Sequence, residues 1–489
     1  MLVGRHEEIQ TLEKAFNSKK PEFLALFGRR RIGKTFLIRQ LFSQKKNTIF
    51  FNVTGLKDGT REEQLIQFNE QISQVFYDGL SLTTPKSWRE AFKVLTQAIA
   101  KQSKNKKLLL FFDELPWMDT PKSRLLQNLD YYWNQHWSND DRIKLIVCGS
   151  SASWIVKKII NNKGGLHNRI TGKIRLSPFT LAETKLFLQH MGVKLNNEQI
   201  LLLYMVTGGV PYYLTHIDKK WSAIQNIEKL AFSEKGLLYT EFDNLFSSLF
   251  DDYEIYIKII RTIAEHQYGI GKRELLKAIG KSSIGEGGVS KLAALEEAGF
   301  IMSIMPFQHK RQGIYYRVID QYSLFYLKWV APLRRSIQEK SLVKQSHHLP
   351  QRTPAWYNWL GYAFETVCYQ HLPLVRSALA ISPDALASAW RYAPRKGNKE
   401  RGAQIDLLFD RNDDAITICE IKYSEEPYAL VKDYVQVLNR KLTVFKEQTN
   451  TKKQLFLAMI TSNGLKNNFY AEDMISGVVT LDNLFGEKK

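Results

Sequence analysis

The chain has 489 residues, 44% of them apolar and 24% charged, a composition typical of soluble globular proteins and a length too great for one hydrophobic core. It has no run near the ~20 apolar residues of a membrane span, and early charge excludes a secretory signal. We therefore expect a cytoplasmic protein that keeps its three cysteines reduced. The net charge of +20 favours a polyanionic partner, most simply nucleic acid, although lysines that only aid solubility would give the same total.

A phosphate-binding loop is predicted at residues 28–35. An apolar strand pattern at 23–27 precedes it and a helical pattern at 36–41 follows it, which is the context that such a loop requires. Lys34 is expected to reach the β- and γ-phosphates of a nucleoside triphosphate, and Thr35 to ligate Mg²⁺. The backbone N–H groups that would surround the phosphates belong to Gly28, Arg29, Arg30, Arg31, Ile32 and Gly33.

A second apolar strand is predicted at 108–112 and ends in two carboxylates. Asp113 can hold the water shell of the Mg²⁺ ion, and Glu114 is placed to polarise the attacking water. A third strand at 144–148 runs into Ser150, which would sense the γ-phosphate from between the other two strands; the alternative is a turn of small residues.

Two further strands are predicted at 47–53 and 173–176, and helical segments alternate with all five strands. This alternation predicts an α/β fold with a doubly wound parallel sheet.

These motifs resemble those of the archaeal-type P-loop ATPases, which are relatives of the AAA+ and STAND groups. Two further segments carry the resemblance, Gly4-Arg5-x-x-Glu8 and Gly208-Gly209-Val210-Pro211-Tyr212-Tyr213-Leu214. The resemblance spans roughly residues 1–235 and implies ATP binding and hydrolysis by a core at 1–178 under a helical lid at 179–250. It also implies that Arg169 can act as a finger toward a γ-phosphate, including that of a neighbour in a homo-oligomer. The alternative for Arg169 is a surface loop residue.

Residues 251–332 have the element order of a winged helix–turn–helix. Helices are predicted at 256–263, 272–279 and 289–298, followed by a hairpin of strands 300–304 and 314–318 around a basic tip that holds Lys310 and Arg311. Such a domain would place its third helix in a DNA groove, or would serve as a rigid connector. A basic linker is expected at 333–354.

The C-terminal segment, 355–489, carries spaced carboxylates. Asp406 and Glu420 lie on two predicted neighbouring strands, and Lys422 shares a strand face with Glu420. A helix supplies Glu365. The pattern resembles the PD-(D/E)xK nuclease superfamily, with isoleucine in place of the proline before Asp406. It implies a restriction-endonuclease-like α/β fold, Mg²⁺ or Mn²⁺ on Glu365, Asp406 and Glu420, and a supporting role for Lys422. Read alone, it also suits an ordinary amphipathic hairpin.

A basic loop at 391–401 is expected to grip phosphates or to be a solvated turn. Gln436 and Lys441 are weaker candidates for supporting the carboxylates. Together these features predict an ATP-hydrolysing protein that couples nucleotide state to DNA binding or metal-dependent DNA cleavage. The alternatives are a nucleotide-controlled signalling or scaffold switch with an inactive nuclease-like domain, and a chaperone-like ATPase that acts on protein.

Overall fold

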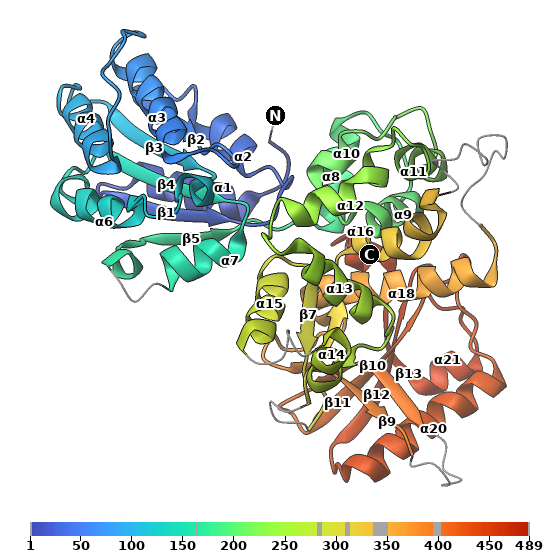
Figure 1. The fold of residues 1–489 in the computed structure, drawn as a ribbon. Helices are drawn as coiled ribbons and strands as arrows, with labels where there is room; N and C mark the ends of the chain where they lie inside the picture. Colours follow the sequence, from blue (N-terminus) through green and yellow to red (C-terminus); the bar gives the residue numbers. More distant parts are fainter. Residues whose placement is uncertain are drawn as a thin grey trace. The chain divides into compact units, whose positions relative to one another are not determined.

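The computed structural model describes residues 2–161, 165–280, 286–308, 313–335, 351–394 and 402–487. The chain divides into two compact units, Met1–Pro178 and Phe179–Lys489 (Figure 1). The division coincides with the end of the ATPase core expected from sequence.

The first unit is built on one parallel sheet with strand order β2-β3-β4-β1-β5. The five predicted strands are confirmed as β1 (Glu22–Phe27), β2 (Thr48–Thr54), β3 (Lys107–Asp113), β4 (Ile143–Gly149) and β5 (Gly172–Arg175). The longer helices are α1 (His6–Asn17), α2 (Lys34–Phe42), α3 (Arg61–Phe76), α4 (Trp88–Ala100) and α6 (Leu125–Gln135); the short α5 (Leu115–Met118) and α7 (Ala152–Ile155) follow β3 and β4.

Helices cover both faces of this sheet, and the apolar residues of its inner strands β3, β4 and β1 are buried on both sides. In β1, Leu24 and Leu26 belong to a core with residues of α1 and α2, whereas Phe23 and Ala25 belong to a second core with residues of α3, α4 and α6. A strand that is buried on both sides is the signature of a doubly wound sheet, and that prediction is confirmed.

The second unit begins with helices, in the order α8 (Leu181–His190), α9 (Asn197–Thr207), α10 (Pro211–Leu214), α11 (Ala223–Ala231) and α12 (Leu237–Ser247). The glycine pair between α9 and α10 makes their connection. Both Gly208 and Gly209 have positive φ, 63° and 66°, and a Cβ on Gly209 would lie 2.2 Å from the carbonyl oxygen of Phe179. Only glycine permits that close approach of backbone to backbone.

A small sheet with order β6-β8-β7 follows, packed with three helices. The elements are α13 (Tyr253–Ala264), β6 (Ile270–Gly271), α14 (Lys272–Ile279), α15 (Glu286–Glu297), β7 (Ile301–Ile304) and β8 (Tyr315–Val318). The predicted helices and the antiparallel hairpin are present, and β6 was not anticipated because two residues carry no pattern. Lys310 and Arg311 of the predicted tip lie outside the described residues.

The last part contains a mixed sheet with order β13-β12-β11-β10-β9. Strands β9 (Leu386–Tyr392), β10 (Ala403–Asp410) and β11 (Ala415–Lys422) are antiparallel neighbours, and β12 (Gln454–Thr461) and β13 (Ile475–Val479) continue the sheet in parallel. Its helices are α18 (Pro354–Gln370), α19 (Leu372–Ala378), α20 (Lys432–Thr449), α21 (Phe469–Met474) and α22 (Leu481–Leu484). Buried residues of α18 pack on one face of the sheet and those of α20 on the other.

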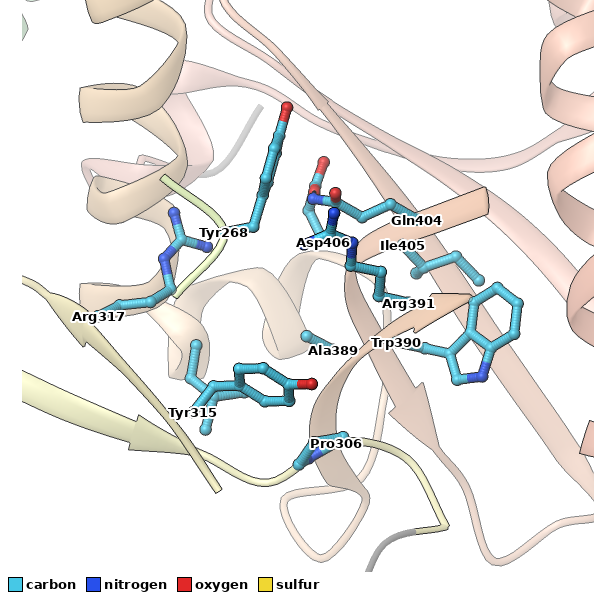
Figure 2. Close-up of a pocket in the computed structure, with 11 residues that line it drawn as sticks. Tyr268, Pro306, Tyr315, Arg317, Ala389, Trp390, Arg391, Gln404, Ile405 and Asp406 are labelled. Carbon is cyan, nitrogen blue, oxygen red and sulfur yellow. The ribbon is translucent and has the colours of Figure 1, made fainter. Parts of the chain in front are cut away.

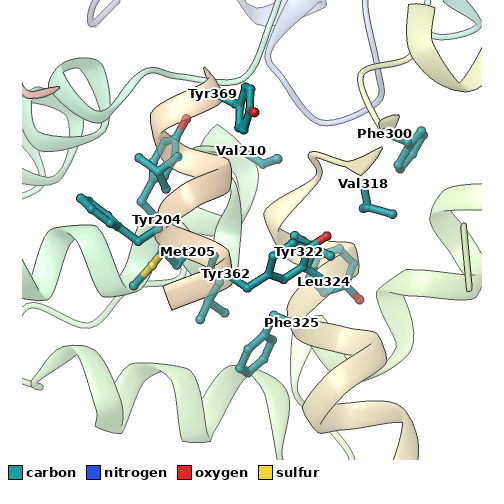
Figure 3. Close-up of a cluster of buried hydrophobic side chains, with 14 of the residues drawn as sticks. Tyr204, Met205, Val210, Phe300, Val318, Tyr322, Leu324, Phe325, Tyr362 and Tyr369 are labelled. Carbon is teal, nitrogen blue, oxygen red and sulfur yellow. The ribbon is translucent and has the colours of Figure 1, made fainter. Parts of the chain in front are cut away.

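The larger hydrophobic core of the second unit joins buried residues from Phe179 to Phe485. Figure 3 shows Tyr204 of α9 and Tyr362 of α18 in the same cluster as Phe325 of α16 (Gln321–Phe325). Buried hydrogen bonds cross the same region, including Tyr322 Oη to the carbonyl of Leu238 at 2.8 Å. The segments expected at 179–250, 251–332 and 355–489 therefore pack as one body. Most of the expected linker, residues 336–350, lies outside the described residues.

Candidate functional site

The loop between β1 and α2 has the backbone of a turn around an anion. Gly33 is the N-cap of α2 and has a φ of 90°. The N-terminus of α2, the end of a helix that favours anions, therefore follows the loop directly. Gly28 passes so close to β5 that a Cβ would lie 2.2 Å from the carbonyl oxygen of Leu176. The two glycines are thus required by conformation and by space.

Lys34 is buried at the start of α2 with a full set of oxygen partners. Its Nζ donates to the carbonyls of Gly28 at 2.8 Å and Arg29 at 2.9 Å, and to Oγ of Ser150 at 3.0 Å. Three oxygens therefore surround the ammonium group of Lys34. Oxygens of a bound phosphate could take their place as its hydrogen-bond acceptors.

The end of β3 brings its two carboxylates to the same loop. The hydroxyl of Thr35 donates to Oδ2 of Asp113 at 2.7 Å. Burial, more than the neighbouring Glu114, raises the pKa of Asp113. Glu114 itself has a left-handed backbone, with φ of 50°, which turns its side chain toward β4.

Ser150 joins the lysine to the glutamate. Its backbone N–H donates to Oε2 of Glu114 at 2.9 Å, and its hydroxyl donates to Oε1. Strand β4, which Ser150 follows, lies between β3 and β1 in the sheet. That position between the two strands was expected, and the sensing of a γ-phosphate by Ser150 stays a prediction. Ser150 thus contacts Lys34 and Glu114 at once.

The other predicted loop residues are placed as follows. Arg29 and Ile32 are buried, whereas Arg30 and Arg31 are half-buried, and Arg31 has φ of 69°. Arg169 is exposed at the end of the turn Gly165–Arg169. An additional contact was not foreseen: Arg5, quoted only as part of a family motif, donates from Nη2 to the carbonyl of Ile32 at 3.4 Å.

The C-terminal carboxylates meet across two antiparallel strands. Leu407 of β10 pairs with Cys419 of β11, so Asp406 and Glu420 are the next opposed positions. Burial, then the carboxylates of Glu365 and Glu420, raise the pKa of Asp406 to about 7. Gln404 donates from Nε2 to Oδ1 of Asp406 at 2.6 Å.

Glu420 is buried but compensated by cations. Lys441 of α20 approaches one oxygen at 2.7 Å, and Lys422 approaches the other at 3.1 Å, where Tyr434 also donates its hydroxyl. Burial alone would raise the pKa of Glu420, but the ammonium groups of Lys441 and Lys422 lower it by more. Lys441, predicted as a weaker candidate for supporting the carboxylates, thus contacts Glu420. Gln436, the other such candidate, is exposed.

Glu365 has a partner that the sequence did not suggest. Its carboxylate forms an ion pair with Arg317 of β8, and both side chains are buried, 12% and 5% exposed. Tyr362 and Tyr369 flank the guanidinium, each ring centroid 5.2 Å from its carbon. The hydroxyl of Tyr369 donates to the carbonyl of Asp406. Glu365 thus binds a guanidinium here, and its role as a metal ligand stays a prediction.

Comparison with known proteins identifies the first of these two sites. Residues 2–217 match the family described as "ATPase domain predominantly from Archaea". Residues 2–217 are thus similar to archaeal ATPase domains. The match passes the end of the first unit, so it includes α8, α9, α10 and the glycine pair of the second.

Relatives of this ATPase include the uncharacterized protein MJECL04 of Methanocaldococcus jannaschii, which is 24% identical over 445 residues, 90% of this chain and 92% of the relative. An uncharacterized ATP-binding protein of the same organism, MJ0423, is 46% identical over 46 residues, which are 9% of this chain and 78% of that protein. Among solved structures, the Walker-type ATPase PABY2304 of Pyrococcus abyssi aligns with 67% of this chain and 96% of its own, at 20% identity and a TM-score of 0.47.

Several contacts of the C-terminal carboxylate site could not be read from sequence. Arg317, Tyr369 and Tyr434 contact residues that are distant in the sequence, and none of the three belongs to a motif. The one signal for Arg317 was a charged residue inside an apolar strand.

Over the described ranges, the structure holds no group of three or more His, Cys, Asp or Glu side chains suited to a metal ion. None of the helices within those ranges is long and apolar enough to cross a membrane. The basic loop at 395–401 lies outside them.

Proposed function

We propose that this ATPase couples ATP hydrolysis to DNA binding or metal-dependent DNA cleavage by the second unit. In the ATP site, Lys34 would bind the β- and γ-phosphates in place of its present oxygen partners. Thr35 and Asp113 are the oxygen pair that would hold Mg²⁺. Glu114 would orient the attacking water. Arg169 would contribute only if a second copy of the chain approached its exposed side chain.

The observation that carries the DNA proposal is the opposed pair Asp406 and Glu420. Mg²⁺ commonly binds through one or two carboxylates with water and phosphate oxygens, so such a pair fits the ion without a third protein ligand. Lys422 and Lys441 already bring positive charge to Glu420, as a bound cation would. A bound Mg²⁺ or Mn²⁺ would supply an activated water for attack on a phosphodiester.

In this proposal the acidic and the basic residues of the site have different roles. Asp406 and Glu420 would hold the cation. Lys422, half-buried beside Glu420, would stabilise the negative charge that develops on the phosphate. The strand pairing keeps these groups together because opposed positions on antiparallel strands share a face.

The segment with α13, α14, α15 and the β7–β8 hairpin supports DNA as the partner. Its element order is that of a winged helix–turn–helix, in which the third helix enters a groove. The net charge of +20 agrees with a polyanionic ligand. The C-terminal sheet with α18 and α20 is consistent with the nuclease-like fold suggested by the spacing of its carboxylates.

The proposal is tested with supercoiled plasmid, ATP and either Mg²⁺ or Mn²⁺. We expect nicking that disappears in Asp406→Asn and in Glu420→Ala, while both variants still hydrolyse ATP. Asp410→Asn is the matched control, since Asp410 lies on the same strand but pairs with Lys453 at 2.8 Å. Lys34→Ala should abolish ATP hydrolysis and show whether nicking needs it.

A second function is favoured by one observation. Every carboxylate of the C-terminal site has a protein partner: Arg317 on Glu365, Gln404 on Asp406, and two lysines on Glu420. A site whose carboxylates already have protein partners suits a nucleotide-controlled switch in which the nuclease-like part binds without cleaving. ATP hydrolysis with no nicking under any divalent ion would support this second function.

A further inference from the structure

A cavity lies between the three-stranded sheet and strands β9 and β10 (Figure 2). Counted with its open mouth, its empty volume is about 630 Å³. The polar and aromatic side chains that line it are Tyr268, Tyr315 and Arg317 on one side, and Arg391, Gln404 and Asp406 on the other.

One wall of the cavity holds a cation with unused donor capacity. Arg317 is 5% exposed, and its Nη1 is taken by Glu365. Its Nη2 is also buried and has no hydrogen-bond partner among the residues that the structure describes. A buried, charged donor without an acceptor destabilises the free protein, so a ligand oxygen that accepts from it is favoured.

The opposite wall adds a second guanidinium. Arg391 of β9 is exposed and lines the same cavity. Two arginines facing one space are suited to a phosphate, whose oxygens accept from planar guanidinium groups. Asp406 brings one negative charge, and Gln404 already donates to it. Because Glu365 pairs with Arg317, the charges of the two guanidinium groups and the two carboxylates balance, and Arg391 supplies the positive charge that faces Asp406 across the cavity.

Aromatic side chains stand at the same opening. Tyr268 is 54% exposed and Tyr315 39% exposed. The guanidinium carbon of Arg391 lies 5.7 Å from the ring centroid of Tyr268. Exposed rings beside arginines form stacking platforms for the bases of unpaired nucleotides.

We propose that this cavity binds one unpaired nucleotide, with its phosphate on Arg317 and Arg391 and its base against Tyr268 or Tyr315. Tyr268 before β6, with Tyr315 and Arg317 of β8, would thereby form half of the substrate site beside Asp406. The choice of a DNA strand as the source rests on the proposed function. The same chemistry is offered by a free mononucleotide, and the experiment separates the two sources.

The test measures fluorescence anisotropy of a labelled 12-nucleotide thymidine strand with the full chain, in EDTA to prevent cleavage and with ADP to fill the ATP site. We expect Arg391→Gln and Tyr268→Ala each to weaken binding about tenfold. Both residues are exposed, so unchanged unfolding temperatures should accompany the loss. Tyr268→Phe keeps the ring and should bind as the wild type does. Arg61→Gln, the same charge change on exposed α3, should have no effect.

Competition identifies the source. The competitors are unlabelled strand, duplex and thymidine monophosphate, each at a similar concentration of nucleotides. If only the unlabelled strand displaces the labelled strand, the ligand is a DNA strand. If the monophosphate displaces it as well, the ligand is a free nucleotide. Wild-type binding by both Arg391→Gln and Tyr268→Ala would overturn the cavity proposal, even if Asp406-dependent nicking were found. Loss of binding in these variants would uphold it, even if no nicking occurred.

Discussion

Removal of either partner of the buried ion pair between Arg317 and Glu365 should be one of the most destabilising single changes in the second unit. The side chains are only 5% and 12% exposed, so removing one leaves the other charged in a poorly solvated space. Burial lowers the pKa of Arg317, but Glu365 raises it by more, and the guanidinium stays charged. Breaking a pair of this kind costs ~3–5 kcal/mol.

We expect Glu365→Gln to lose about 3 kcal/mol of unfolding free energy, the lower end of that range, because Tyr362 and Tyr369 still face the guanidinium at 5.2 Å. Arg317→Met should lose a similar amount, since Glu365 is then left beside Asp406. The double variant Arg317→Met with Glu365→Leu buries no charge and should recover most of the stability.

Hydrogen exchange of peptides from α18 and β8 is the appropriate assay, because it reports the second unit separately from the first. The single variants should exchange about a hundredfold faster there, and α3 of the first unit should be unchanged. Lys185→Gln, which breaks a surface pair with Glu487, is the control and should change little. Single variants within 1 kcal/mol of the wild type, or a double variant no better than either, would refute the reasoning.

Three further predictions concern other parts of the chain. Ser150→Ala should lower the rate of ATP hydrolysis about tenfold to a hundredfold in a steady-state assay, less than the ~10²–10⁴ typical of losing a general base. Burial lowers the pKa of His371, whose Nε2 accepts from the backbone N–H of Leu181 at 3.1 Å. Its contribution to stability is therefore complete above pH ~6.5 and lost as the pH falls through the lower folded pKa; thermal unfolding of His371→Gln should depend less on pH in that window. Gly209→Ala should destabilise the second unit by about 2–4 kcal/mol, because strain at positive φ adds to contact with a carbonyl oxygen.

Each of the three has a matched control in the chain. Ser151→Ala alters the neighbouring hydroxyl and should leave hydrolysis near normal. His190→Gln changes an exposed histidine, so the pH dependence of unfolding should be retained. Gly208→Ala has the same positive φ, but its nearest contact would be an ordinary 3.6 Å, so it should cost less than Gly209→Ala in urea unfolding. Equal losses from the two glycine variants would mean that strain alone, and not the close approach, decides the effect.

The elements of the ATP site followed from the sequence because each is local. Strand β1, its loop and α2 are consecutive, and the apolar run of β3 ends at Asp113 whatever the rest of the chain does. Asp406 and Glu420 were also predictable, since a short turn between two strands leaves little choice of pairing.

Only the tertiary structure decided which distant side chains complete these sites. Arg317 and Glu365 are 48 positions apart, and Lys441 reaches Glu420 from 21 positions away. No periodicity relates such residues, because their meeting depends on how helices and sheets pack around a shared core. The same packing merged three expected segments into one unit and put a cavity with two arginines beside Asp406. The sequence by itself determined which chemistry each motif carries, and the fold determined which charges face it.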